Sequence, residues 1–172
     1  MLNLFQHLFI GRSRNKFGMT EKENMLKKQQ TQIVLDPKLA KKLRIAIVRT
    51  TYHHVFNENL EQHCKDTLVE HGVPNSQIKT FVVPGSWELP LMVQQLAKSK
   101  QFDAIVVFGI IVKGETHHFD MIANEVARSL MQLSLDYSIP IALEVLAVYH
   151  IKQAEARAGD DEYNKGIEGA TA

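Results

Sequence analysis

Residues 104–120 read Ala-Ile-Val-Val-Phe-Gly-Ile-Ile-Val-Lys-Gly-Glu-Thr-His-His-Phe-Asp, a nearly continuous apolar run followed by a glycine turn, a hydroxyl and two imidazoles. Apolar side chains on both faces indicate a strand inside a parallel sheet that is covered on both sides. We place this strand at Ala104–Gly109. Open α/β sheets bind ligands beyond the carboxyl ends of their strands, and a helix that begins there offers unpaired N–H groups to a phosphate. The stretch therefore predicts a parallel sheet and a candidate phosphate site together.

The polar half of this stretch also suits a purely structural role. In that alternative, Thr116 caps the following helix, and His117 and His118 face water. His53 and His54 form a second adjacent pair earlier in the chain. Neighbouring histidines point in different directions, and the sequence has no cysteine cluster or His-x₃-His spacing. We therefore predict no metal site.

The rest of the chain repeats the pattern of a short apolar segment followed by an amphipathic one. Three further strands, mostly rich in β-branched residues, are predicted at Ile45–Val48, Ile78–Val83 and Ile141–Leu146. Helical spacing, with Gly72 and Pro140 as stop signals, predicts helices around Leu60–His71, Trp87–Lys98, Ile122–Tyr137 and Ile151–Ala158. Four successive βα units predict a single α/β domain, a flavodoxin-like three-layer α/β/α sandwich around a four-stranded parallel sheet.

Size and composition narrow the class of protein. The chain has 172 residues, enough for one domain with a substantial core, and its formal net charge of +1 gives no general attraction to nucleic acids or anionic membranes. No apolar run approaches the roughly 20 residues that span a bilayer. The lone cysteine, Cys64, cannot form an intrachain disulfide, which fits a cytoplasmic protein. Its helical spacing from Leu60 and Leu68 predicts a buried side chain.

The first thirty residues differ in composition from the rest. Residues 15–30 are rich in Lys, Glu, Gln and Asn, and the apolar stretch at the start precedes the basic residues, the reverse of a secretory signal. We expect residues 1–30 to be a mobile extension, with an amphipathic presequence as the open alternative, and residues 31–172 to form the folded domain. Gln32–Leu35, cut off by Pro37, is a candidate strand that pairs with the edge of a neighbouring subunit.

Polar and aromatic side chains follow the other predicted strands as well. Tyr52 follows the first strand and is either an aromatic platform or a plug between helix and sheet. After the second strand, the N–H groups of Ser86 and Trp87 and the Glu88 carboxylate suit a polyhydroxylated ligand, although an acidic residue here also favours the helix dipole. Arg157 lies beyond the fourth strand, where its guanidinium either binds two phosphate oxygens or is solvated.

Four motifs in this sequence together resemble those of the 6,7-dimethyl-8-ribityllumazine synthase family. They are Val83-Pro-Gly-Ser-Trp-Glu-Leu-Pro90, Gly109-x₄-Gly-Glu-Thr-x-His-Phe-Asp120, Ala123-Asn-Glu125, and Ala156-Arg-Ala-Gly159 followed by Asn164-Lys-Gly166. The resemblance covers residues 31–172. It implies a transferase that condenses 5-amino-6-ribitylaminouracil with 3,4-dihydroxy-2-butanone 4-phosphate, releasing phosphate and water without a metal or redox cofactor, in the penultimate step of riboflavin biosynthesis.

The resemblance also implies how the chain assembles. Family members form pentamers with the active site between adjacent subunits, and some build decamers or hollow shells of twelve pentamers. Self-association is therefore expected here, with the segment at Gln32–Leu35 added to the neighbouring subunit's sheet. Riboflavin synthase is a candidate protein partner.

Residues that match family positions for the pyrimidine and its ribityl chain lie in three loops. Tyr52 matches the aromatic side chain that stacks on the pyrimidine ring, usually Phe or Trp in the family. Ser86, Trp87 and Glu88 match the turn that holds the ribityl chain. The stretch whose backbone reads the pyrimidine edge is matched by Ile111, Val112 and Lys113.

Another set of residues matches the family positions that bind the phosphate and transfer protons. Glu115 and Thr116 match the phosphate-binding turn, and Arg157 is expected to reach that phosphate from the next subunit. His118 matches the histidine that moves protons between the two substrates, which suits an imidazole because it ordinarily titrates at about pH 6.5.

Some positions depart from the family pattern. Leu143 and Glu144 stand where many members have Phe-Gly, and that Phe lines the pyrimidine site from the neighbouring subunit. The sequence ends at Ala172, whereas members usually continue through a C-terminal helix, so we expect helix packing to be lost there. These departures keep open a degenerate paralogue that binds ligands or forms a structural shell. A flavodoxin-like redox module is a more distant alternative, because no Ser/Thr-rich phosphate loop follows the first strand.

Overall fold

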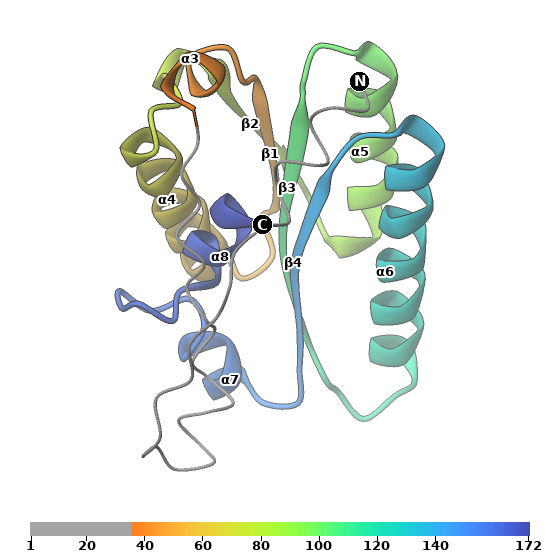
Figure 1. The fold of residues 1–172 in the computed structure, drawn as a ribbon. Coiled ribbons are helices and arrows are strands. Elements are labelled where there is room, and N and C mark those ends of the chain that lie inside the picture. Colours follow the sequence, from red (N-terminus) through yellow and green to blue (C-terminus); the bar gives the residue numbers. More distant parts are fainter. Residues whose placement is uncertain (1–35) are drawn as a thin grey trace, which may run out of the picture. The chain divides into compact units, whose positions relative to one another are not determined.

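The structure, a computed structural model, describes residues 36–172. Four strands pair in parallel in the order β2-β1-β3-β4 (Figure 1). They are β1 (Ile45–Thr50), β2 (Ile78–Val83), β3 (Ala104–Val112) and β4 (Ile141–Val148). Each contains the segment that the sequence predicts, so the four-stranded parallel sheet is confirmed. The strand predicted at Gln32–Leu35 and the extension over residues 1–30 lie outside the described residues.

Helices cover both faces of this sheet, which confirms the predicted three-layer sandwich (Figure 1). One face carries α4 (His54–Glu70), α7 (Ile151–Glu155) and α8 (Lys165–Thr171), and the other carries α5 (Leu89–Ser99) and α6 (His118–Tyr137). Three short helices, α3 (Pro37–Ala40), η1 (Asn75–Gln77) and η2 (Ser86–Glu88), complete the described chain. None of the helices in residues 36–172 has the length and apolarity needed to cross a membrane.

Strand β3 lies at the centre of both cores. Its buried residues alternate between them: Val106 and Phe108 pack in the core under α4, while Ile105 and Val107 pack in the core under α5 and α6. The near-continuous apolar run is thus buried on both faces, as predicted. The strand continues three residues beyond the predicted end at Gly109, because β4 pairs beside it as far as Val148.

Helix boundaries differ from the predictions, most of all at α4, which begins at His54 rather than around Leu60. Helix α6 begins at His118, ahead of the predicted stripe that starts at Ile122, so the candidate histidine opens the helix. Helix α7 ends at Glu155, short of the predicted Ala158. Helix α4 ends near Gly72, which has a positive φ of 92° as its predicted role as a stop signal requires.

A charged pair closes the amino-terminal edge of the sheet. The Arg44 guanidinium donates to both oxygens of Asp103, with Nη2–Oδ1 at 2.9 Å and Nε–Oδ2 at 3.1 Å, and the Arg44 backbone N–H donates to Oδ2 at 2.9 Å. The side-chain hydrogen bond from Arg44 lowers the pKa of Asp103. This pair joins the start of β1 to the residue before β3, at the opposite edge of the sheet from the candidate site.

The residues after Asn164 form a helix that the sequence analysis did not predict. Asn164 caps α8, since its Oδ1 accepts from the Gly166 N–H at 2.7 Å and its Nδ2 donates to the Gly159 carbonyl at 2.6 Å. Two glycines lower the helical propensity of this segment but allow close packing. Gly166 lies against the backbone of Leu60 in α4, and Gly169 lies against Glu144 in β4. Helix α8 therefore packs against both α4 and β4, while the loss of helix packing expected beyond Ala172 stays a prediction.

Replacing Gly166 with Ala is expected to destabilise the domain strongly. The new Cβ would lie 2.0 Å from the Leu60 carbonyl oxygen, a backbone atom that cannot rotate away. We expect the free energy of unfolding in urea to fall by about 3 kcal/mol or more at fixed protein concentration. Gly114→Ala is the control, because a Cβ there meets no atom within 4 Å. Equal effects of the two substitutions would contradict this account of the α4–α8 contact.

Candidate active site

The candidate residues gather at one edge of the sheet because all four strands are parallel. Tyr52 follows β1, the η2 turn follows β2, the segment 113–118 follows β3, and Arg157 lies beyond β4 and α7. In Figure 1 this carboxyl edge is the lower one, where β3 runs to α6 and β4 runs to α7. The strand order makes these loops neighbours in space.

The loops after β1 and β2 are tied to each other through the backbone. The Thr51 N–H donates to the Val83 carbonyl at 2.8 Å, and the Thr51 hydroxyl donates to the Pro84 carbonyl at 2.9 Å. The Tyr52 N–H donates to the same Pro84 carbonyl at 3.3 Å. The aromatic platform and the candidate ribityl turn are therefore held in one relative position.

The first loop presents Tyr52 outward. Its side chain is 69% exposed, which excludes the alternative that it plugs the seam between helix and sheet. The His53 ring packs edge-on against it, with the ring centroids 4.7 Å apart. His53 adopts a left-handed backbone conformation with φ of 56°, and burial lowers its pKa. The backbone reverses here so that the chain enters α4.

The second loop is a tight turn closed by its own carboxylate. Oε2 of Glu88 accepts from the Gly85 N–H at 2.9 Å, while Glu88 and Trp87 remain exposed. The Ser86 hydroxyl lies close to β3, at 3.1 Å from the point where a Cβ on Gly109 would lie. Gly109 therefore allows this turn to approach the strand that leads to the candidate phosphate site.

Beyond Phe108, the side of β3 that faces β1 has no strand partner within the described residues. The β1–β3 register ends at the pair Arg49–Phe108, whereas β4 accompanies β3 to Val112 on the other side. Backbone groups need hydrogen-bonding partners, so this free margin near Ile111 and Val112 suits a planar ligand with donors and acceptors on its edge.

The third loop leaves its polar groups accessible. Glu115, Thr116, His117 and His118 are all exposed. The Thr116 hydroxyl accepts a long contact of 3.4 Å from the His118 N–H, but His117 and not Thr116 is the cap residue of α6, so of the structural alternative only the water-facing histidines are found. The same arrangement places a hydroxyl and an imidazole together at the beginning of α6, where the helix dipole favours an anion.

Lys113 lies in a cluster that the sequence analysis did not find. Its ammonium nitrogen is 5.6 Å from the centre of the Phe119 ring, 5.2 Å from that of Tyr149 and 3.9 Å from Oδ1 of Asp120. Oδ2 of Asp120 also lies 3.8 Å from Nδ1 of His117. The cluster thus includes residues on both sides of the third loop, Lys113 before it and Phe119 and Asp120 after it. The position of Tyr149 directly after an apolar strand was the signal available for finding it.

Among the described residues, two candidates make no polar contact with the others. Leu143 is in the middle of β4, paired with Val107, and its side chain is 44% exposed. Arg157 donates from Nη1 to the Gln153 carbonyl at 3.0 Å. Within residues 36–172, neither forms a hydrogen bond or ion pair with another candidate residue.

Comparison with known proteins decides the family. The family model described as 6,7-dimethyl-8-ribityllumazine synthase matches residues 42–172, which include all four strands and the four loops at the carboxyl edge. The chain belongs to the lumazine synthase family. A protein of Campylobacter hominis named 6,7-dimethyl-8-ribityllumazine synthase is 38% identical to it over 130 residues, 76% of this chain and 83% of the relative. The resemblance carried by the four motifs is thus confirmed.

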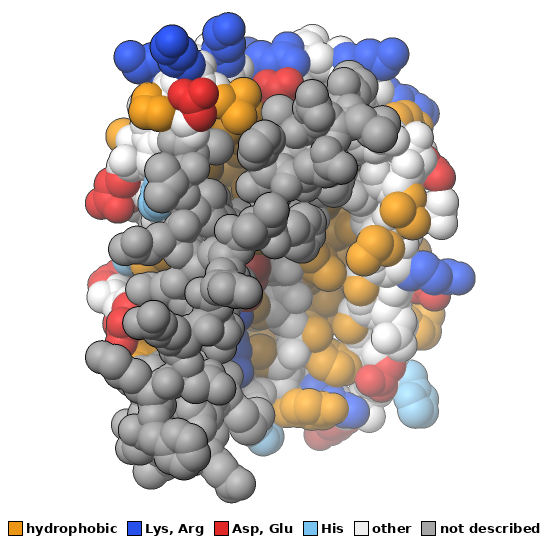
Figure 2. Space-filling model, in the orientation of Figure 1, with side chains coloured by type: hydrophobic (Ala, Val, Ile, Leu, Met, Phe, Trp, Pro, Cys, Tyr) orange, Lys and Arg blue, Asp and Glu red, His pale blue; other side chains and the backbone are white. Residues whose placement is uncertain are grey.

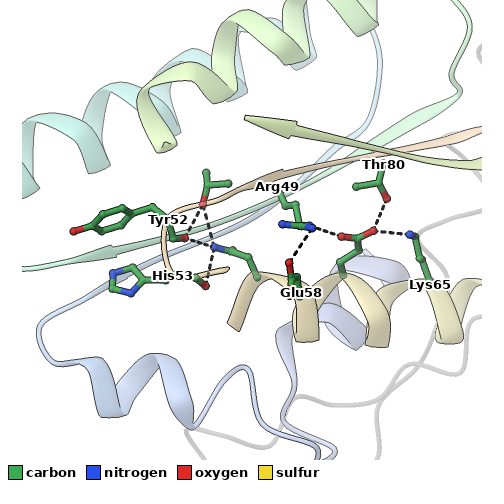
Figure 3. A network of polar contacts seen from close by, with 9 residues as sticks. Arg49, Tyr52, His53, Glu58, Lys65 and Thr80 are labelled. Atoms are coloured by element: carbon green, nitrogen blue, oxygen red, sulfur yellow. Dashed lines mark hydrogen bonds and ion pairs between the residues drawn. The ribbon is translucent and has the colours of Figure 1, made fainter. Parts of the chain in front are cut away.

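Beside the loops of this lumazine synthase family member lies a network of charges around the buried Glu61 (Figure 3). Glu61 of α4 accepts hydrogen bonds of 2.5 Å from Arg49 of β1, Thr80 of β2 and Lys65 of α4, and Arg49 also reaches Glu58 at 3.2 Å. Burial opposes the ionisation of Glu61, but the hydrogen bonds outweigh it and hold the pKa below the ordinary value of 4.5. The network fastens α4 to the two strands whose loops carry the aromatic and ribityl candidates.

Other reactive side chains do not join the site. Burial raises the pKa of the Cys64 thiol to about 12, so this cysteine stays protonated near neutral pH, and its predicted burial is confirmed. In the described part of the chain, no group of three His, Cys, Asp or Glu side chains is placed to hold a metal ion.

The Glu61 network predicts a specific pH dependence of stability. Because the folded-state pKa of Glu61 is lowered, its contribution is present above the unfolded-state pKa and is lost as the pH falls through the folded value. Glu61→Gln should reduce the free energy of unfolding by about 2 kcal/mol at neutral pH. The difference in the free energy of unfolding between Glu61→Gln and the wild type should become smaller as the pH falls below 4.5.

Urea titrations at several pH values measure this difference. Glu58→Gln is the matched control, because Glu58 is exposed and makes one contact with Arg49. Surface pairs contribute about 0 to 1 kcal/mol, so this control should change stability little. If the difference in unfolding free energy between Glu61→Gln and the wild type stayed constant down to acid unfolding, the stabilising role of ionised Glu61 would be contradicted.

Proposed function

We infer that this protein is a lumazine synthase, a transferase of riboflavin biosynthesis. It condenses 5-amino-6-ribitylaminouracil with 3,4-dihydroxy-2-butanone 4-phosphate and releases phosphate and water. The observation that carries this conclusion is the family match over residues 42–172, which spans every loop at the carboxyl edge of the sheet. The roles of individual residues below are proposals supported by their geometry.

The pyrimidine substrate occupies the side of the site near β1 and β2. The exposed Tyr52 ring stacks on the pyrimidine, and the margin of β3 at Ile111 and Val112, together with the adjoining Lys113, binds the edge of its ring. The η2 turn holds the ribityl chain through backbone N–H groups at Ser86 and Trp87. Oε2 of Glu88 is held by Gly85 at 2.9 Å, which leaves Oε1 to accept from a ribityl hydroxyl.

The phosphate of the second substrate binds at the start of α6. Backbone N–H groups at Glu115 and Thr116 and the Thr116 hydroxyl provide donors where the helix dipole is positive. Arg157 adds a guanidinium from the neighbouring subunit, and a bidentate contact there neutralises one of the negative charges of the phosphate. The electrostatic attraction also favours departure of the phosphate as an anion.

His118 transfers protons during the condensation. The pyrimidine amine attacks the ketone, water leaves as the imine forms, phosphate is eliminated, and the second amine closes the ring on the remaining carbonyl with loss of a second water. Each step requires a proton to be removed or supplied near neutral pH, where an imidazole does both. The exposed imidazole at the first position of α6 lies beside the proposed phosphate site.

We further propose that the working enzyme is a pentamer, alone or within a larger shell. Large hydrophobic side chains gather on the face shown in Figure 2, over β4 and α6. The structure exposes Leu143 on β4 and Met121, Met131 and Leu135 on α6. Soluble monomers rarely expose extended apolar patches, so this face suits a subunit contact.

A second subunit would also complete the site, because in the described part of the chain Leu143 and Arg157 make no polar contact with the other candidates. Leu143 then lines the neighbour's pyrimidine site. The proposed location is the cytoplasm, which the single buried and protonated cysteine supports. Riboflavin synthase is the proposed protein partner.

Replacing His118 should slow the reaction without abolishing it. Purified protein mixed with both substrates should form the lumazine chromophore, and His118→Ala should lower kcat by about a hundredfold. The KM values should change little, because positioning of the two substrates is retained. His117→Ala is the matched control, since the His117 side chain is 99% exposed and has no assigned role. No product above the uncatalysed rate from the wild type would overturn the proposed function.

Replacing Arg157 should weaken binding of the phosphate substrate, and subunit mixing tests which chain supplies this residue. Arg157→Ala should raise the KM for 3,4-dihydroxy-2-butanone 4-phosphate by roughly tenfold to a hundredfold. When the His118→Ala and Arg157→Ala chains are refolded together, about one quarter of the sites should contain both native residues. Activity at low substrate should then exceed the mean of the two separate variants. Activity equal to that mean would place Arg157 in its own chain's site.

A further inference from the structure

The side chain of Asn57, in the first turn of α4, is fully buried beneath the loop that carries Tyr52. Its Nδ2 group donates to the Tyr52 carbonyl at 2.8 Å and to the Thr50 hydroxyl at 3.0 Å, with a longer contact of 3.5 Å to the His53 carbonyl. The Thr50 hydroxyl in turn donates to the Tyr52 carbonyl at 3.2 Å. One amide group thus contacts the last residue of β1 and two residues of the loop that follows it.

The orientation of this amide is fixed by its surroundings. Turning it over would place Oδ1 against the carbonyl oxygens of Tyr52 and His53, which are acceptors. In the observed orientation Oδ1 is buried and has no hydrogen-bond partner among the described residues. Buried polar atoms without partners are uncommon and unfavourable. The unpartnered Oδ1 of Asn57 is therefore an energetic cost that accompanies the hydrogen bonds donated by its Nδ2 group.

The loop has few other ways to hold Tyr52. Its ring is largely exposed and has one aromatic neighbour, His53, whose backbone adopts a left-handed conformation. The peptide groups on either side of the Tyr52 Cα are fixed instead: the N–H by the Pro84 carbonyl and the carbonyl by Asn57 and Thr50. Figure 3 shows both rings pointing away from these hydrogen bonds. Only the side-chain torsions of Tyr52 remain free.

We propose that Asn57 is a positioning residue for the pyrimidine substrate, acting through Tyr52. It holds the loop backbone so that the exposed ring is already oriented before the pyrimidine stacks on it. This inference rests on the proposed function, because the substrate it concerns is the one assigned to Tyr52. A purely structural role for Asn57 would alter stability and would affect both substrates alike.

The test compares the two substrates in Asn57→Ala. The KM for 5-amino-6-ribitylaminouracil should rise by about tenfold, because a small misplacement of a binding group is costly, while the KM for the phosphate substrate stays within about twofold. Thr50→Val, which removes one of the two donors to the Tyr52 carbonyl, should show a smaller rise of the same kind. Cys64→Ala is the stability control, because it also alters a fully buried residue of α4 but does not contact the loop.

A double-substitution cycle separates positioning from general loosening. Tyr52→Ala should raise the KM for the pyrimidine by about five- to 150-fold, the range expected for the loss of one stacked aromatic ring. Adding Asn57→Ala to Tyr52→Ala should then produce little further change, since the residue through which it acts is already absent. Full additivity of the two substitutions, or equal rises in both KM values, would overturn the proposal.

Equilibrium dialysis with 5-amino-6-ribitylaminouracil keeps this test independent of turnover. If the wild type binds the pyrimidine but makes no product, the proposed function fails, and the ratio of dissociation constants still decides the role of Asn57. If Asn57→Ala does not fold, Thr50→Val carries the same comparison with a nearly isosteric change. An unchanged pyrimidine affinity in a folded variant would reject the positioning role.

Discussion

The burial of β3 on both faces is the constraint on which the rest of the molecule depends. Val106 and Phe108 face one core and Ile105 and Val107 face the other, so each helical layer packs against the same strand. A strand enclosed in this way must have parallel neighbours and crossover helices. Those crossovers bring every connecting loop after a strand to one edge. The position of the candidate active site is thus a consequence of how the apolar side chains are buried.

Polar contacts near that edge have a different task from the core. The Glu61 network and the Asn57 amide both lie between α4 and the strands β1 and β2, where apolar packing would not fix the direction of a loop. Hydrogen bonds depend on direction, whereas hydrophobic burial does not. Stability of the domain therefore comes mainly from its two cores, and the orientation of Tyr52 comes from a small number of buried hydrogen bonds.

The strands and the layer architecture were predictable because they depend on local apolar runs, and the candidate loops because parallel strands end at one edge. Other features depend on contacts distant in sequence. The end of β3 is set by pairing with Val148, and α8 is stabilised by glycine packing on Leu60, although glycine lowers helical propensity. Nothing in the sequence distinguishes Asn57 from other polar helix residues, because its role depends on contacts with the loop. Tyr149 becomes notable only beside Lys113.

Trp87 has a consequence for spectroscopy. It is the only tryptophan in the chain, it lies in the turn after β2, and 58% of its surface is exposed. All indole fluorescence of the protein therefore originates at the edge of the sheet where the candidate residues gather. The natural sequence contains its own optical reporter, whose emission follows events at the mouth of the site without any introduced label.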